Sequence, residues 1–182
     1  GNNEIAQRAH LPKPTVTRLT YTLTQLGYLN YSPESGKYSL SVGVLALGYS
    51  FLASQDIRAI ARPMMQEFAD FARATVCLAA RDQPHMVFLD VCQGNPTFQM
   101  RREVGARVPY GMTALGRAYH CGLPEAARAA MLEEHRKTGR QEDWEGFRAS
   151  FEKAVREYQK NGFCVSLGEW NKDVYSVAVP LV

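Results

Sequence analysis

The chain has 182 residues, of which 46% are hydrophobic and 21% are charged, and its formal net charge is +3. This composition is typical of globular proteins and excludes disordered and fibrous chains. No apolar stretch approaches the roughly 20 residues of a membrane-spanning helix, and the first ten residues lack the basic and apolar blocks of a secretory signal. We therefore expect a soluble cytoplasmic protein.

The charge is unevenly distributed along the chain. Residues 1–40 carry four basic and two acidic side chains, whereas the rest carries 17 basic and 16 acidic ones. A mildly positive leading segment is compatible with an anionic partner, although the net charge of any short segment varies by one or two by chance.

The first segment predicts two helices separated by a tight break. The stretch "EIAQRA" is helical in pattern, and "HLPKP" interrupts it with two prolines. The helix restarts near Pro14, because proline is tolerated in a first turn, and Gly27 suits a left-handed cap at its end. One apolar stripe runs along this second helix at steps of 3, 4 and 3, and it consists of Val16, Leu19, Leu23 and Leu26. We expect this stripe to pack on the first helix. This is a helix-turn-helix pattern.

A β-hairpin is predicted directly after the second helix. The alternating stretches "YLNY" and "KYSL" flank "SPESG", whose Pro33 and Gly36 are turn formers. Lys37 lies near the tip. A strand pair attached to a helix-turn-helix is a wing.

The second helix contains five threonines, although threonine is a mediocre helix former. The face opposite the stripe has no carboxylate and consists of Thr15, Thr17, Arg18, Tyr21, Thr22 and Gln25. Hydroxyls and arginine hydrogen-bond phosphates and base edges, and a carboxylate would be repelled there. The alternative is a solvated face, but such faces normally mix Glu and Lys. The pattern favours DNA binding.

Residues 41–54 predict a strongly apolar connecting helix. We expect its apolar side chains to be buried against a second copy of the chain or against the next domain. A helix over 57–73 follows, with one apolar stripe and with Pro63 inside, which should kink or restart it. The stripe consists of Ile60, Met64, Phe68 and Phe71.

The rest of the chain predicts an α+β domain, an antiparallel sheet covered by helices. Strands are expected at 75–81, 86–92, 97–102, 163–167 and 174–182, and helices at 114–121, 124–135 and 145–161. The last helix carries an apolar stripe at steps of 4, 4 and 3, which consists of Phe147, Phe151, Val155 and Tyr158. The chain closes on a strand with no following turn, and little precedes the first helix. We therefore expect it to lack structure at both ends.

In this order the motifs resemble the IclR (isocitrate lyase regulator) family of bacterial transcription factors. The resemblance is carried by "EIAQRAHLPKPTVTRLTYTLTQLGYL", "SPESGKYSL", "DIRAIARPMMQEF", "VGARVPYGMTALGRAY" and "YQKNGFCVSLGE". It implies a winged helix-turn-helix DNA-binding domain at 1–41, a linker helix at 42–56 and a GAF-like effector-binding domain at 57–182, incomplete at its C-terminus. It also implies a homodimer or dimer of dimers that binds operator DNA and responds to a small organic acid, aromatic or a short oxo acid.

The resemblance implies which residues contact DNA. Lys13, Thr15, Thr17 and Arg18 would lie nearest the bases, and Thr22 and Lys37 near phosphates. The family usually has Ser or Thr where Pro14 stands, so the entry to this helix differs here.

An effector pocket is expected around "RVPYGMTALGRAY". Thr113 can cap a helix that starts at Ala114, and a helix N-terminus suits a carboxylate, although Thr113 could be only a cap. The resemblance assigns the amides of Ala114 and Leu115 to the ligand. The remaining expected walls are polar at Ser166 and Ser176 and apolar at Met100, Val108, Met112 and Val174. Relatives often carry an acidic group at the Ser166 position, and they continue past residue 182 with a strand whose serines face the effector.

The four cysteines predict buried, reduced thiols, because they are far apart, form no CxxC pair and mostly adjoin apolar or small residues. They are Cys77, Cys92, Cys121 and Cys164. His85, His120 and His135 lie in separate segments, so we expect no metal site, and no cofactor is expected either. Arg101, Arg102 and Arg107 could attract an anion, but a solvated sheet edge is favoured.

Two other function classes remain as alternatives. One is a GAF-like enzyme with cysteine redox chemistry, and the other is an interaction module whose winged helix binds protein. No cysteine lies beside a resolving cysteine in the sequence, and a nucleophilic triad or glycine-rich phosphate loop is missing. We therefore expect a regulator and not an enzyme.

Overall fold

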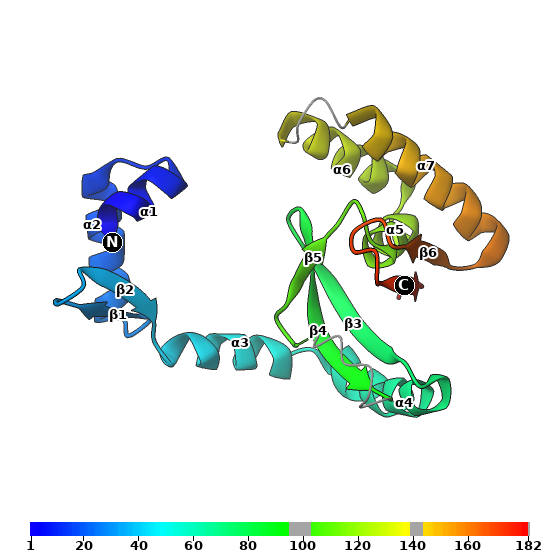
Figure 1. Ribbon diagram of the computed structural model, residues 1–182, viewed down its shortest axis with the longest axis horizontal. Helices are drawn as coiled ribbons and strands as arrows, with labels where there is room; N and C mark the ends of the chain where they lie inside the picture. Colours follow the sequence, from blue (N-terminus) through cyan, green and yellow to red (C-terminus); the bar gives the residue numbers. More distant parts are fainter. Residues whose placement is uncertain (95–102, 139–143, 182) are drawn as a thin grey trace. The chain divides into compact units, whose positions relative to one another are not determined.

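The structure is a computed structural model that describes residues 1–94, 103–138 and 144–181. The chain divides into two compact units, Gly1–Ile57 and Arg58–Val182 (Figure 1). In the residues described, no helix is long and apolar enough to cross a membrane.

The first unit contains three helices and one hairpin. Its elements are α1 (Asn2–Ala9), α2 (Lys13–Gln25), β1 (Leu29–Ser32), β2 (Lys37–Leu40) and α3 (Gly43–Ala53). Gly27 follows α2 with a φ of 76°, and the Tyr28 amide donates to the Leu23 carbonyl at 2.9 Å. This is the left-handed helix end that the sequence predicts.

The hairpin also forms as predicted. β1 and β2 are antiparallel, with Tyr31 opposite Tyr38 and their ring centroids 4.9 Å apart. The Gly36 amide donates to the Ser32 carbonyl at 2.9 Å, and Gly36 takes the positive φ of 63° that glycine adopts without strain.

The apolar stripe of α2 is buried only in part, which corrects the prediction. Val16 and Thr20 are the buried residues of α2, whereas Leu19, Leu23 and Leu26 stay exposed. Helix α1 has eight residues, and the two buried residues of α2 are one helical turn apart. Thr20 contacts α1, because its hydroxyl lies 3.1 Å from Oδ1 of Asn2.

The apolar helix α3 has no buried residue in the described part of the chain. Val42, Leu45, Leu47, Tyr49 and Phe51 are all more than half exposed. Within its own unit, this apolar surface is therefore not buried.

The second unit contains two antiparallel sheets in its described ranges, where the sequence predicts one sheet. Its elements are α4 (Asp56–Ala72), β3 (Thr75–Asp82), β4 (His85–Gln93), β5 (Arg107–Pro109), α5 (Ala114–Gly122), α6 (Glu125–Thr138), α7 (Trp144–Asn161), β6 (Cys164–Leu167) and β7 (Tyr175–Ala178). The orders are β3-β4-β5 and β6-β7. The strand predicted at 97–102 lies outside the described residues, and the three-residue β5 is too short to give a periodic signal.

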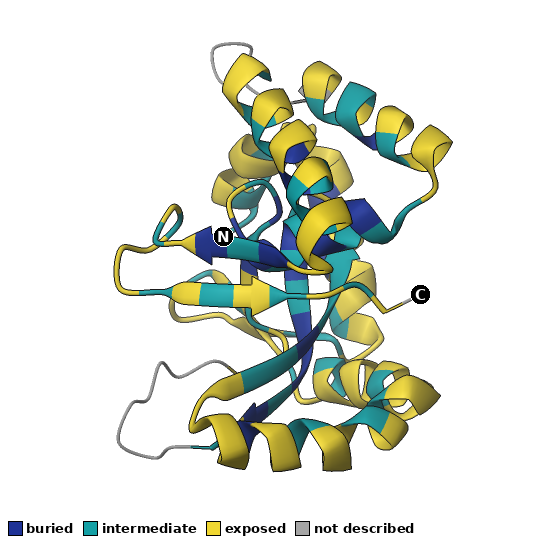
Figure 2. Cartoon of the chain, turned by 90° about the vertical axis from the view of Figure 1, so that its right-hand side faces the viewer, coloured by how far each residue is buried: buried dark blue, intermediate teal, exposed yellow. Residues whose placement is uncertain are grey.

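Helices and strands of this unit meet in two clusters. The first joins β4, β5, α6 and α7 through Met86, Phe88, Val108, Tyr110, Met131 and Phe151. The second joins α5, α7 and β6 through Ala118, Cys121, Ala154 and Cys164. Buried positions follow the strands and the inner faces of the helices (Figure 2). The predicted stripe of α7 is confirmed, because Phe147, Val155 and Tyr158 pack against these clusters beside Phe151.

Helix α4 does not pack through its apolar stripe. Its apolar stripe from Ile60 to Phe71 is exposed, whereas Ala69 is fully buried. Gly94 lies so close that a Cβ there would meet the Ala69 carbonyl oxygen at 1.6 Å. Helix α4 is also assigned as one helix across Pro63, so this proline does not restart it.

A buried ion pair selects this face of α4. Asp90 on β4 is 0% exposed, and its carboxylate meets the guanidinium groups of Arg58 and Arg62, which lie on the same side of α4 as Ala69. A buried carboxylate requires such partners, and the apolar stripe must then face outward.

Candidate DNA-binding and effector-binding sites

The face of α2 proposed for DNA is exposed and carries no acidic residue. Lys13, Thr15, Thr17, Arg18 and Thr22 are all exposed, and Thr15, Arg18 and Thr22 line one shallow hollow together with Leu19. Among the described residues, Lys13 and Arg18 form no ion pair. Their charges are thus available to an anion.

Hydroxyls of Thr17, Thr20, Thr22 and Thr24 are engaged within the helix, which explains why threonine is tolerated there. Thr17 donates to the Lys13 carbonyl at 3.0 Å, Thr22 to the Arg18 carbonyl at 3.0 Å, and Thr24 to the Thr20 carbonyl at 2.8 Å. Threonine commonly bonds back to the carbonyl four residues earlier. To donate to a phosphate or a base, the hydroxyls of Thr17 and Thr22 must rotate out of these bonds, whereas the exposed side chains of Lys13 and Arg18 have no such bond to break.

The hairpin lies beside the start of α2. Lys13, Tyr31, Gly36 and Tyr38 line a second shallow hollow together with the N-terminus of α1, and Lys37 is exposed at the start of β2. The structure therefore brings two of the predicted cationic contacts, Lys13 and Lys37, to the same end of the unit.

The expected effector site begins at the N-terminus of α5, which Thr113 caps. The Thr113 Oγ1 accepts from the Gly116 amide at 3.3 Å and donates to the Pro109 carbonyl at 2.9 Å. Ala114 is fully buried and Leu115 packs against the first cluster. Thr113 is thus a helix cap in fact, and the effector role of the Ala114 and Leu115 amides stays a prediction.

The two predicted serines face each other across β6 and β7. Ser166 pairs with Ser176 in the antiparallel register, and the Ser166 hydroxyl lies 3.3 Å from the Met112 carbonyl oxygen, directly before α5. Ser166 is buried and Ser176 half-buried. The fold thus joins the polar wall to the helix N-terminus.

The apolar positions predicted for this pocket are dispersed. Val108 is buried in the first cluster, Val174 is half-buried and Met112 is exposed. Met100 lies outside the described residues, as do Arg101 and Arg102. Arg107 pairs with Asp82 at the sheet edge.

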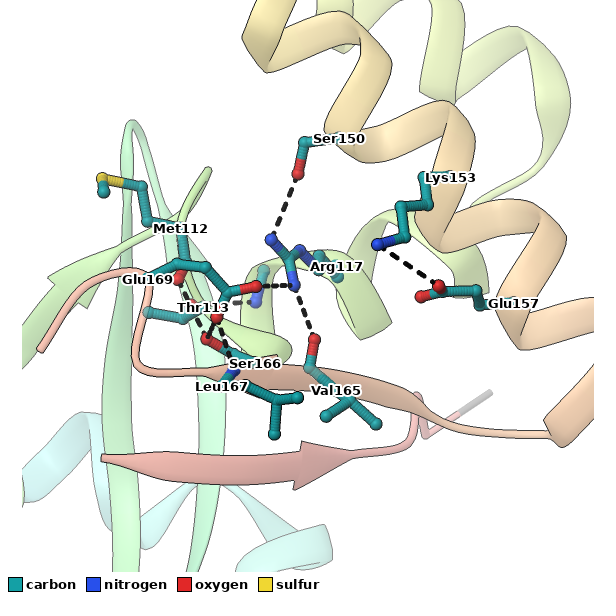
Figure 3. A network of polar contacts seen from close by, with 11 residues as sticks. Met112, Thr113, Arg117, Ser150, Lys153, Glu157, Val165, Ser166, Leu167 and Glu169 are labelled. Atoms are coloured by element: carbon teal, nitrogen blue, oxygen red, sulfur yellow. Dashed lines mark hydrogen bonds and ion pairs between the residues drawn. The ribbon is translucent and has the colours of Figure 1, made fainter. Parts of the chain in front are cut away.

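A carboxylate that sequence reasoning missed lies at the polar wall (Figure 3). Glu169 accepts from the Ser166 hydroxyl at 2.6 Å, from the Leu167 amide and from Arg117 of α5 at 2.9 Å. Arg117 also donates to the Val165 carbonyl at 2.6 Å and to Ser150 of α7 at 3.2 Å. The stretch "SLGEW" carries no local sequence signal for this network. Arg117 lies 48 or more residues before Val165 and Glu169, and the contacts of Glu169 with Ser166 and Leu167 depend on the turn that follows β6.

The network changes the electrostatics of Glu169 and Ser166. Burial alone would raise the pKa of Glu169, but hydrogen bonds from Ser166, from Arg117 and from its own backbone lower this pKa to about 2. The carboxylate is therefore ionised at neutral pH. The only proton of the Ser166 hydroxyl is donated to it, so Ser166 can offer a ligand an acceptor but no donor unless Glu169 moves.

The described residues contain no group of three or more His, Cys, Asp or Glu side chains that could hold a metal ion. His120 is buried, with its Nδ1 3.1 Å from the Tyr110 hydroxyl, and burial followed by the charge of Arg128 lowers its pKa to about 4. His135 stacks on Phe147. These imidazoles are part of the packing of α5, α6 and α7.

Comparisons with known proteins agree on one family. The model of the IclR helix-turn-helix domain matches residues 1–33, and that of the bacterial transcriptional regulator IclR C-terminal region matches residues 49–182. The HTH-type transcriptional regulator TsaQ1/TsaQ2 of Comamonas testosteroni is 35% identical over 184 residues, which cover 100% of this chain and 66% of that protein.

Solved structures of this family share the fold. The crystal structure of an IclR family transcriptional regulator from Brucella abortus superposes with a TM-score of 0.92 at 47% identity, covering 100% of this chain and 68% of that one. An IclR homologue from Microbacterium hydrocarbonoxydans, crystallised in complex with 4-hydroxybenzoate, has a TM-score of 0.67 at 20% identity. The match covers 100% of this chain and 75% of that one.

The chain thus spans about two thirds of the length of TsaQ1/TsaQ2 and of the Brucella protein. The two family models cover most of it, at both the helix-turn-helix and the α+β unit. On these grounds the chain belongs to the IclR family of bacterial transcriptional regulators.

Proposed function

We propose that this protein is a bacterial cytoplasmic transcription regulator that binds operator DNA and changes its DNA binding or its activity when a small organic acid occupies the second unit. Residues 1–41 are the DNA-binding domain, 42–56 the linker helix and 57–182 the effector-binding domain of this proposal. The observation that carries it is the exposed, acid-free face of α2 with Lys13 and Arg18. The matched relatives named above are transcriptional regulators, which supports this class over a redox enzyme or a protein-binding module.

In the proposed complex, α2 enters the major groove with its N-terminal residues first. Arg18 and Lys13 read base edges together with Thr15 and Thr17, while Thr22 and Lys37 contact phosphates. Arginine can make two parallel hydrogen bonds to guanine, a contact worth about 1–3 kcal/mol of discrimination. Each neutralised phosphate steepens the salt dependence by about 0.9 in the log–log slope.

The proposed effector is a small acid whose carboxylate meets the N-terminus of α5. The amides of Ala114 and Leu115 and the positive end of the helix dipole favour an anion there. Ser166 and Ser176 form the adjoining polar wall. The complex of the Microbacterium protein shows that a chain of this fold accommodates 4-hydroxybenzoate, so this aromatic acid is a suitable first probe.

The test of DNA binding is fluorescence anisotropy with the 182-residue protein. It compares a duplex from upstream of the protein's own gene with a scrambled duplex, at several salt concentrations. We expect the wild type to prefer the upstream duplex and Arg18→Ala to lose most of that preference. Arg8→Ala is the matched control, because it removes one exposed positive charge from α1 of the same unit.

Two outcomes separate the alternatives. Equal losses in Arg18→Ala and Arg8→Ala would show that only net charge matters and that α2 is not the reader. The absence of both a preference and a salt slope in a dimeric preparation would contradict the regulator proposal itself.

A further inference from the structure

Two cysteines that are distant in the sequence lie side by side in the second unit. The sulfur atoms of Cys121, near the end of α5, and Cys164, the first residue of β6, are 3.7 Å apart. Both thiols are free, and they are 8% and 1% exposed. The sequence interpretation considered only cysteines that are neighbours in the sequence, and so it could not find this contact.

We propose that Cys121 and Cys164 form a reversible intramolecular disulfide when the protein meets hydrogen peroxide, which links α5 to β6. A disulfide joins two sulfur atoms at about 2.05 Å. The two sulfur atoms must therefore move toward each other by less than the diameter of one sulfur atom. Cys164 lies in a four-residue strand and Cys121 in the last turn of a helix, so both positions end an element and can shift without breaking a long hydrogen-bonded ladder.

The two thiols are not equivalent, and the structure indicates which one reacts first. The Cys164 thiol donates its hydrogen to the sulfur of Cys121. This hydrogen bond lowers the pKa of Cys121 against the opposing effect of burial, and the charge of Arg128 lowers it further. The same hydrogen bond, together with burial, raises the pKa of Cys164. The lowered pKa favours the thiolate form of Cys121, and Cys121 is also the more exposed of the two thiols, so we assign it as the nucleophile.

The chemistry proceeds in two balanced steps. The Cys121 thiolate attacks one oxygen of hydrogen peroxide, the O–O bond breaks, and sulfenic acid forms while hydroxide leaves and takes up a proton as water. The sulfur of Cys164 then attacks the sulfenic sulfur, the S–O bond breaks, and the released oxygen leaves as water with the proton of Cys164. Overall, two thiols lose two electrons and peroxide is reduced to two water molecules.

The bond would connect the two elements that carry the proposed effector contacts. Ser166 follows Cys164 by two residues on the same face of β6, and α5 begins at the residues that Thr113 caps. The formation of the disulfide itself does not depend on the proposed function, and it is tested without DNA or effector.

The test is peptide mapping of the wild-type chain after peroxide treatment under native conditions. Peroxide is removed, free thiols are alkylated in denaturant, and the protein is digested with trypsin. Cleavage after Arg117, Arg128, Lys160 and Lys172 places the two cysteines in the separate peptides 118–128 and 161–172. We expect these peptides to be joined, two of the four thiols to be lost, and dithiothreitol to restore all four.

Variants test the order of the steps. In Cys164→Ala, the sulfenic acid on Cys121 has no partner, so dimedone should label peptide 118–128. In Cys121→Ala, neither the crosslink nor the label should appear. Cys77→Ala is the control that should retain the crosslink, because Cys77 lies on β3 and outside the pair.

Two results would overturn the proposal. One is the retention of four thiols in the wild type at peroxide concentrations that oxidise its methionines. The other is a crosslink that maps to other cysteines or joins two chains. If an alanine variant fails to fold, the wild-type peptide map alone still decides.

Discussion

Asp90 shows how a single buried side chain selects the packing of an element. Its carboxylate is 0% exposed and meets Arg58 and Arg62 of α4, while the amide of Val91 donates to it at 2.8 Å. Arg58 Nε and Asp90 Oδ2 are 3.0 Å apart but not aligned as a hydrogen bond, so this contact is an ion pair. Removing the charge leaves two guanidinium groups without their counterion.

We expect Asp90→Asn to lower the free energy of unfolding by about 2 kcal/mol, because the buried side chain loses its charge-assisted contacts with Arg58 and Arg62, whose own side chains are partly exposed. Urea denaturation at neutral pH measures this. Asp82→Asn is the matched control at the sheet edge, where Asp82 and Arg107 are both exposed, and it should cost less than about 1 kcal/mol. Equal losses in the two variants would contradict the assigned role of Asp90.

Glu169 gives a prediction that depends on pH. Its pKa is about 2 in the folded protein against a usual value near 4.5, so its ionised form stabilises the fold. This contribution is fully present above about pH 4.5 and is lost as the pH falls toward 2. The stability advantage of the wild type over Glu169→Gln should therefore shrink between about pH 5 and about pH 3.

Urea titrations of the wild type and Glu169→Gln at several pH values measure this difference. Glu145→Gln, an exposed residue at the start of α7, controls for the loss of one surface carboxylate and should show a smaller change with pH. An advantage of the wild type that stays constant down to about pH 3 would mean that the hydrogen bonds to Glu169 do not depend on its charge.

At the scale of elements, close backbone contacts hold α5 in place. A Cβ at Gly116 would lie 1.8 Å from the Tyr110 carbonyl oxygen, whereas a Cβ at Gly146 of α7 would meet nothing within 4 Å. Alanine favours a helix over glycine by about 1 kcal/mol, but overpacking against backbone costs more.

Gly116→Ala should therefore destabilise the protein by about 2–3 kcal/mol, and Gly146→Ala should stabilise it by up to about 1 kcal/mol. Thermal unfolding followed by circular dichroism gives both values. The critical result is that the same substitution changes the stability in opposite directions in the two helices. A stabilising Gly116→Ala would refute the tight packing of α5 on Tyr110.

The helices also show where sequence patterns succeed and where they stop. The steps of the apolar residues predict α2, α4 and α7 correctly as helices, because periodicity is a property of the local chain. Only for α7 does the apolar stripe mark the buried face. In α2 only Val16 and Thr20 are buried, and in α4 the pair of Asp90 with two arginines turns the stripe outward.

At the scale of the whole molecule, the apolar side chains of α3 predict a contact surface. Its eleven residues include no buried one, and exposed apolar patches of this kind mark interaction sites. We expect the proposed homodimer to use this surface. Leu45→Lys should shift the chain toward monomers in analytical ultracentrifugation without loss of helical circular dichroism, since the side chain supports no core of its own unit.

The control for this prediction is Ser50→Lys, which adds the same charge to α3 without removing an apolar side chain. It should associate more strongly than Leu45→Lys. A wild type that stays monomeric at concentrations of tens of micromolar, or two lysine variants that behave alike, would exclude α3 as the contact surface.

The sequence by itself determined the helices, the hairpin and its turn, the cap at Thr113 and the membership of the IclR family. These follow from periodicity, turn chemistry and motif order, all of which act over a few residues or survive in linear order. The predicted DNA contacts cluster for the same reason, since most lie on one helix.

The tertiary structure alone decided the contacts between distant segments. It joined Glu169 to Arg117, Cys121 to Cys164 and Asp90 to α4, pairs that no spacing in the chain indicates. The physical reason is that such contacts depend on which faces of the elements meet, and that choice is made by the packing and charge compensation of the whole unit.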